Sequence, residues 1–194
     1  MKAFNGFKSE ASTGKIKQLP AGAYVAKIKK VFIDGDEPDQ YIRLRVDVCE
    51  GPFENFFLNR FMEDKEKSKY EPKYKGDYKI RIPNDNNPKA MYPESDLKRF
   101  NDMIYRIEQS NDGYHWDWDE KGLEGLLVGI NMVESEYNGY KFTKIGRTEI
   151  VQDVRAGRVT AMEPKAPRGD ADDSQHIDQQ SGYQKVDFGE ELPF

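Results

Sequence analysis

A run of alternating apolar and polar residues at 41–48 constrains the fold more strongly than any other stretch of the chain. Its apolar members are Ile42, Leu44, Val46 and Val48, and its polar members are Tyr41, Arg43, Arg45 and Asp47. A period of two matches the alternation of side chains along a β-strand with one face on a core and the other in solvent. The sequence therefore predicts a strand that buries its aliphatic side chains and holds Tyr41, Arg43 and Arg45 outward.

Similar patterns predict further strands on both sides of this one, with turn residues between them. The expected strands cover residues 23–33, 55–61, 78–82, 126–137 and 140–151. The mixed-charge stretch at 63–77 is expected to run over the surface, and Asn138-Gly139 is expected to form a hairpin turn. One helix is predicted from about Ser95 to Ser110. Its apolar stripe consists of Leu97, Phe100, Ile104 and Ile107.

This order of elements predicts a fold that is mainly β with one helix. Three strands, a helix and then a two-stranded hairpin is the order of an OB-fold, a five-stranded barrel. The helix is expected to close the open end of the barrel. A small α+β sandwich has the same order of elements and is the alternative. We expect the OB-fold-like domain at residues 20–162, after a flexible arm at 1–19.

The net charge of −5 lies entirely in the last part of the chain. Residues 163–194 contain eight acidic and three basic residues, which leaves 27 of each kind in residues 1–162. This last segment is rich in Asp, Gln, Gly and Ser and poor in large apolar residues, a composition typical of disorder. We therefore expect a disordered acidic tail on a body of zero net charge. Such a body binds phosphates only if its bases gather on one face.

Several functional classes receive little support from the sequence. One cysteine allows no internal disulfide bond. The sequence contains two histidines and no Cys-x-x-Cys, so no pattern for a zinc site is present. It also contains no P-loop, so no pattern for a nucleotide-hydrolysing site is present. No apolar run is long enough to span a membrane, and no secretory signal is recognisable. We expect a cytoplasmic protein that is not an enzyme and needs neither a cofactor nor a metal ion.

Basic and aromatic residues recur at positions predicted to face solvent. Binding of single-stranded DNA needs a basic groove for the backbone and aromatic faces on which bases stack. In an OB-fold, these contacts come from the face of strands 2 and 3 and from the last hairpin. The predicted DNA contacts are Lys27, Lys29, Tyr41, Arg43, Arg45, Trp116, Tyr137, Tyr140, Lys141, Phe142, Lys144 and Arg147.

Each of these residues also has a structural interpretation. Exposed Arg and Lys on a strand often only keep it soluble and protect its edge. Phe56, Phe57 and Phe61 are expected in the core rather than beneath bases. Of Trp116 and Trp118, one is expected at the surface, and core packing of both is the alternative.

The chain ends in a short motif that suits recognition by another protein. The residues predicted to contact a partner are Asp187, Phe188, Glu190, Glu191, Leu192, Pro193 and Phe194. Pro193 biases Leu192 toward an extended conformation, which orders the tip at low entropic cost. An aromatic residue on an acidic stalk suits a hydrophobic pocket ringed by Lys or Arg.

This tip resembles the C-terminal peptide of bacterial-type single-stranded DNA-binding proteins, which runs roughly Met-Asp-Phe-Asp-Asp-Asp-Ile-Pro-Phe. Asp187, Phe188, Pro193 and Phe194 are the same residues. Glu190 and Glu191 stand for Asp, Leu192 stands for Ile, and Gly189 departs by replacing one acid. The resemblance covers nine residues and implies a protein that coats single-stranded DNA. It also implies that the tip, anchored by Phe194, recruits replication and recombination proteins.

Residues 63–90 and the segment Leu19-Pro20-Ala21-Gly22-x-Tyr24 at the first predicted strand resemble replication-module proteins of bacteriophages. This resemblance implies a phage-encoded protein located in the cytoplasm of a bacterial host. Two other functions stay open. One is an interaction adaptor that does not bind DNA. The other is a divalent-metal nuclease using the triplets Glu63-Asp64-Lys65 and Glu71-Pro72-Lys73. The sequence also leaves open whether the protein forms a homo-oligomer.

The charge distribution predicts that the acidic tail competes with DNA for the basic surface. Deleting residues 164–194 is expected to raise the affinity for an oligonucleotide at low salt, because the competing carboxylates are removed. Fluorescence anisotropy with labelled oligothymidylate measures this affinity. Equal affinity of the full-length and shortened proteins would contradict the idea.

Overall fold

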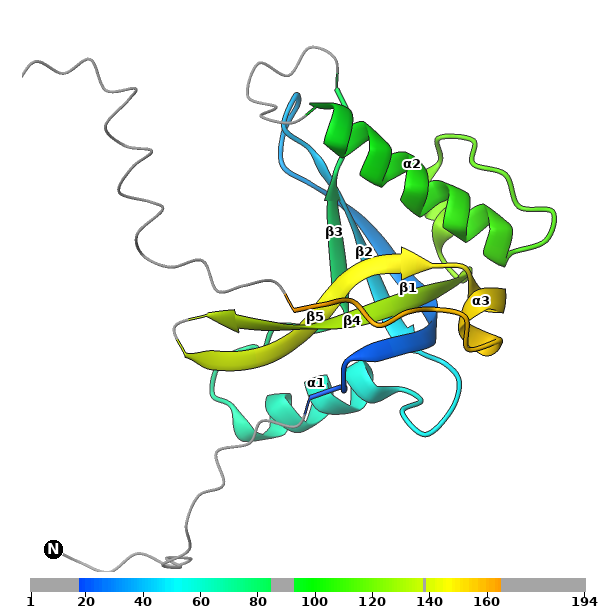
Figure 1. Ribbon diagram of the computed structural model, residues 1–194. Helices are drawn as coiled ribbons and strands as arrows, with labels where there is room; N and C mark the ends of the chain where they lie inside the picture. The colour runs from blue at the N-terminus through cyan, green and yellow to red at the C-terminus, as the bar shows by residue number, and fades with distance from the viewer. Residues whose placement is uncertain (1–17, 85–92, 138, 165–194) are drawn as a thin grey trace, which may run out of the picture.

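The computed structural model describes residues 18–84, 93–137 and 139–164 (Figure 1). The predicted partner-binding tip at 186–194 and Asn138 of the predicted hairpin turn lie outside these residues. Among the described helices, none has the length and apolar character needed to cross a membrane.

Five antiparallel strands of the described residues form one sheet, so the fold is mainly β as predicted. The strands are β1 (Gly22–Asp34), β2 (Tyr41–Val48), β3 (Asp77–Arg81), β4 (Leu127–Tyr137) and β5 (Tyr140–Glu149). Their order across the sheet is β3-β2-β1-β4-β5. Helix α2 (Pro93–Ser110) follows β3 in the chain and contacts β3, β4 and β5. This arrangement is consistent with an OB-like fold.

The sheet is open, so the predicted five-stranded barrel is not closed. In the described residues, β3 and β5 are the two edges and do not pair with each other. The side chain of Gln18 occupies part of the β5 edge. Its Nε2 donates to the carbonyl of Lys141 over 3.0 Å, and its Oε1 accepts from the N–H of Thr143 over 2.8 Å. These bonds use edge groups that a closing strand would need.

The strand predicted at 55–61 is wrong, because this segment belongs to helix α1 (Phe56–Lys67). The carboxylate of Asp47 accepts hydrogen bonds from the N–H groups of Phe57 and Leu58, each over 3.0 Å. Asp47 thereby satisfies N–H groups that the first turn of a helix leaves without partners. Residues 63–67 also belong to α1, so the first part of the irregular surface stretch predicted at 63–77 is helical.

The other predicted strands and the predicted helix are confirmed, and the core has the expected composition. Ile42, Leu44, Val46 and Val48 of β2 are all buried. Phe100, Ile104 and Ile107 of α2 are buried with them, and so is Met103. Leu97 was expected in the same stripe but is 49% exposed. The buried arc of the helix centres on Phe100, Met103 and Ile107, which leaves Leu97 beyond its margin.

Asp47 is the polar residue on which the position of α1 depends. Replacing Asp47 with Asn weakens the acceptor of the helix N–H groups and is expected to lower the free energy of unfolding by about 2–3 kcal/mol. Urea denaturation followed by circular dichroism measures this loss. The control, Asp64→Asn, removes only an i,i+4 pair with Arg60 on the same helix and should cost less than about 0.5 kcal/mol. Equal stabilities of the two variants would contradict the capping role.

Candidate nucleic-acid interface

The outer face of β1, β2 and β3 carries an ordered array of charged and aromatic side chains. The pairing register places three residues of each strand in three rows, which we call the three-strand grid. The rows are Lys30–Arg45–Asp77, Phe32–Arg43–Lys79 and Asp34–Tyr41–Arg81. The alternate residues of β2 face the core, so the prediction that Tyr41, Arg43 and Arg45 share the opposite face is confirmed.

Cationic groups lie over the aromatic rings of this grid. The guanidinium of Arg43 is 4.1 Å from the centre of the Phe32 ring, and that of Arg45 is 5.1 Å from it. The Tyr41 ring lies 4.4 Å from the ammonium of Lys79 and 5.0 Å from the guanidinium of Arg81. Such contacts fix the cations electrostatically over the negative face of each ring.

Tyr74, from the loop after α1, extends this stacking at one end of the grid. Its ring centre lies 4.8 Å from the guanidinium of Arg45, and its hydroxyl donates to the carbonyl of Val46 over 3.2 Å. Burial is the main cause that raises the pKa of the Tyr74 hydroxyl, so the side chain stays protonated and neutral. Tyr74 therefore supplies a fixed ring beside Arg45.

Carboxylates pair with the arginines of the grid. Asp34 accepts from Nε and Nη2 of Arg43 over 2.8 and 2.9 Å. Asp77 accepts from Nε and Nη2 of Arg45 over 2.9 and 3.0 Å, and from Nη1 of Arg43 over 3.1 Å. Lys79 pairs with Asp34 over 3.3 Å, and Arg81 pairs with Asp39 and Asp96.

These pairs leave the grid almost neutral. Its five cations (Lys30, Arg43, Arg45, Lys79 and Arg81) meet two carboxylates of the grid itself (Asp34 and Asp77) and two beside it (Asp39 and Asp96), so the grid and these partners together carry a net charge of +1. The sequence predicted a basic strip on β2. The structure instead places a network of alternating charge there.

The grid contains residues that were not predicted from the sequence. A bulge between Ile28 and Lys30 shifts the parity of β1, so that Lys30 and Phe32 join the outer face. The predicted contacts Lys27 and Lys29 are exposed on β1 but precede the grid. On β3, Asp77, Lys79 and Arg81 alternate with Tyr78 and Ile80, a signal that the sequence already contained.

A second aromatic group lies at the end of β4 and the start of β5, on the side of the molecule opposite α3 (Val151–Arg155) (Figure 1). Tyr137 pairs directly with Tyr140, and their side chains are 71% and 78% exposed. Side chains opposite each other or two apart on paired strands share a face, so Phe142 and Lys144 lie on the face of these tyrosines.

The remaining predicted contacts are placed differently. Lys141 pairs with Glu136 on the other face of the hairpin. The Nε of Arg147 donates to Glu149 of the same strand over 2.5 Å, so that guanidinium already has a carboxylate partner.

The two tryptophans also differ in their surroundings. Trp116 is partly buried against the core, with its ring edge-on to Phe100. Trp118 is the surface aromatic of this pair, being 76% exposed.

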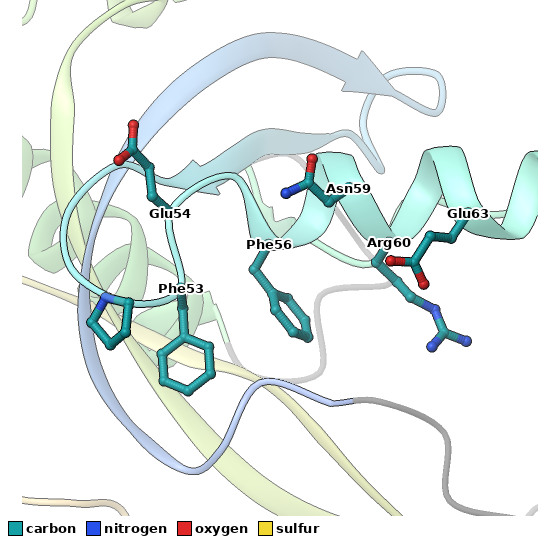
Figure 2. Close-up of a pocket in the computed structure, with 7 residues that line it drawn as sticks. Phe53, Glu54, Phe56, Asn59, Arg60 and Glu63 are labelled. Carbon is teal, nitrogen blue, oxygen red and sulfur yellow. The ribbon is translucent and has the colours of Figure 1, made fainter.

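A hollow of about 200 Å³ lies beside the start of α1 (Figure 2). Phe53 and Phe56 line it with rings 6.2 Å apart, and Glu54, Arg60 and Glu63 surround them. Two carboxylates and one guanidinium make this hollow unfavourable for a phosphate. The described residues also contain no cluster of three or more His, Cys, Asp or Glu side chains that could hold a metal ion.

Comparison with known protein families and with curated proteins identified no relative of this chain. No protein-family model matches the chain, and no curated protein matches it. Its function therefore has to be inferred from the arrangement of its own residues.

The pairing of Asp34 predicts acid sensitivity of the folded state. Hydrogen bonding from Arg43 is the main cause that lowers the pKa of the Asp34 carboxyl from 3.8 to about 2. A lowered pKa stabilises the folded state above the unfolded pKa, and this contribution is lost as the pH falls through the folded pKa. Urea denaturation between about pH 5 and pH 2 should therefore show a smaller loss of stability for Asp34→Asn than for the wild type. Parallel curves would contradict the pairing.

Proposed function

We propose that this protein is a non-enzymatic single-stranded DNA-binding protein with an OB-like domain. Its three-strand grid would contact the DNA, and its C-terminal tip would recruit replication and recombination proteins. The observation that carries the proposal is the stacking of Arg43 and Arg45 on Phe32 and of Lys79 and Arg81 on Tyr41. Rings and cations in fixed rows are the parts needed to bind unpaired bases and their phosphates.

The grid presents its cations and rings over a continuous surface. Its rows come from neighbouring strands of one sheet, so cations and rings alternate across a continuous surface. Bases stack on aromatic rings and on guanidinium planes without regard to sequence, because every base has a π-face. This supports binding that is largely independent of sequence.

The β4–β5 hairpin supplies a second group of the same kind. Tyr137 and Tyr140 expose most of their surface next to Phe142 and Lys144. Large exposed rings are unfavourable in water and indicate a surface that meets a partner. We propose that bases stack on these rings while the backbone follows the basic side chains.

The C-terminal tip supports the recruitment part of the proposal through its sequence alone. Its resemblance to the bacterial single-stranded DNA-binding peptide, together with the phage-like segments, suggests a phage-encoded protein that acts in a bacterial host cytoplasm. In this proposal, the domain holds DNA while Phe194 anchors an enzyme of replication or recombination.

The near neutrality of the grid favours one alternative, an adaptor whose domain binds protein instead of DNA. Alternating charges with a net of +1 give little long-range attraction for a polyanion. An adaptor would bind no oligonucleotide at any salt concentration.

The double substitution Arg43→Ala with Arg45→Ala tests the role of the grid. If each arginine contacts one phosphate, the variant should bind oligothymidylate more weakly. The slope of log affinity against log salt should also become shallower by about 1.4, since each phosphate contact on a single strand contributes about 0.7. Fluorescence anisotropy over a range of NaCl concentrations measures both quantities.

The matched control is Arg155→Ala with Arg158→Ala, which removes the same charge from exposed positions at α3 and beyond it. A second variant, Arg43→Lys with Arg45→Lys, keeps the charge and should retain most of the salt slope. An unchanged slope in the alanine variant, with its thermal stability preserved, would remove the grid from the DNA-binding surface.

A further inference from the structure

The arginines of the three-strand grid already bind carboxylates at the positions where a phosphate would bind. A guanidinium fork accepts a carboxylate or a phosphate through the same pair of parallel N–H groups. Asp77 takes the Nε and Nη2 fork of Arg45, and Asp34 takes the Nε and Nη2 fork of Arg43. Any phosphate that reaches these forks must displace an aspartate.

Asp77 holds the central position in this network. It accepts hydrogen bonds from both arginines, through Oδ1 and Oδ2 to Arg45 and through Oδ2 to Arg43. Asp34 bridges Arg43 and Lys79 in the same way. The side chain of Asp77 is 21% exposed, so solvent screens its pairs only in part.

The aromatic rings hold the arginines independently of the carboxylates. Arg43 stacks on Phe32, and Arg45 lies between Phe32 and Tyr74. Tyr74 is itself fixed by its hydrogen bond to Val46 and by packing against Phe61. Removing a carboxylate should therefore free the N–H groups of the guanidinium, while the guanidinium itself stays stacked on the aromatic ring.

We propose that Asp77, assisted by Asp34, is an internal competitor for the phosphates of single-stranded DNA and sets the affinity of the grid. This inference rests on the proposed function. The aspartates and the phosphates compete for the same N–H groups of each arginine. This competition keeps the affinity for single-stranded DNA low and the binding reversible. Removing their charge strengthens binding, although the two residues contact the arginines and not the DNA.

The experiment compares the full-length wild type with Asp77→Asn, Asp34→Asn and the double variant. Binding of labelled oligothymidylate is measured by anisotropy over a range of NaCl concentrations. Asp77→Asn is expected to bind about threefold to tenfold more tightly at about 0.1 M salt. Its salt slope should steepen by about 0.7, the contribution of one added phosphate contact. Asp34→Asn is expected to show a smaller change in the same direction.

The matched control is Asp64→Asn, which removes one negative charge from the Arg60 pair on α1. It should change the affinity less than about twofold, because it frees no arginine of the grid. Thermal denaturation of each variant accompanies the binding curves. If Asp77→Asn unfolds, Asp34→Asn carries the test.

The outcomes separate this inference from the proposed function. If the wild type binds and the folded Asp77→Asn or Asp34→Asn variant binds no more tightly than Asp64→Asn, the competitor role is wrong and the proposed function stands. Weaker binding by the folded variants would mean that the aspartates position the arginines, which also overturns the inference. If neither the wild type nor any variant binds, both proposals fail together.

Discussion

Strand β2 lies between β1 and β3, and its two faces meet opposite environments. On one face, Ile42, Leu44, Val46 and Val48 are buried in the core. On the other face, Tyr41, Arg43 and Arg45 form the centre of the three-strand grid, and Asp47 continues the same face beneath the start of α1. A shift of one residue in its pairing would exchange these faces, so the hydrophobic core and the candidate binding surface depend on the same register.

The parts of the fold that local periodicity determines were predictable from the sequence. Five of the six predicted strands and helix α2 follow from periods of two and of 3.6 residues. The segment at 55–61 was misassigned because a short apolar run is ambiguous, and the buried carboxylate of Asp47 decides in favour of a helix. The open sheet depends on long-range contacts, such as those of Gln18 with β5, that no local pattern contains.

The candidate site was predictable only where side chains alternate without interruption between the two faces of a strand. Alternation along β2 placed Arg43 and Arg45 on the correct face, but the bulge in β1 brings Lys30, which was not predicted, into the grid in place of Lys29. No local pattern indicates that Asp34 and Asp77 neutralise the arginines, because these contacts join residues of different strands. Alternation along β2 therefore predicted a strip for phosphates and bases where pairing across strands produces a balanced network.

The most direct test of the account is a map of the amide chemical-shift changes that oligothymidylate causes in the isotope-labelled protein. If the grid binds single-stranded DNA, the changes will concentrate on β1, β2, β3 and the tip of the β4–β5 hairpin. They will leave α3 and the short turn at Glu120–Leu123 unaffected. Shifts confined to other surfaces, or no shifts in dilute buffer, would contradict the account.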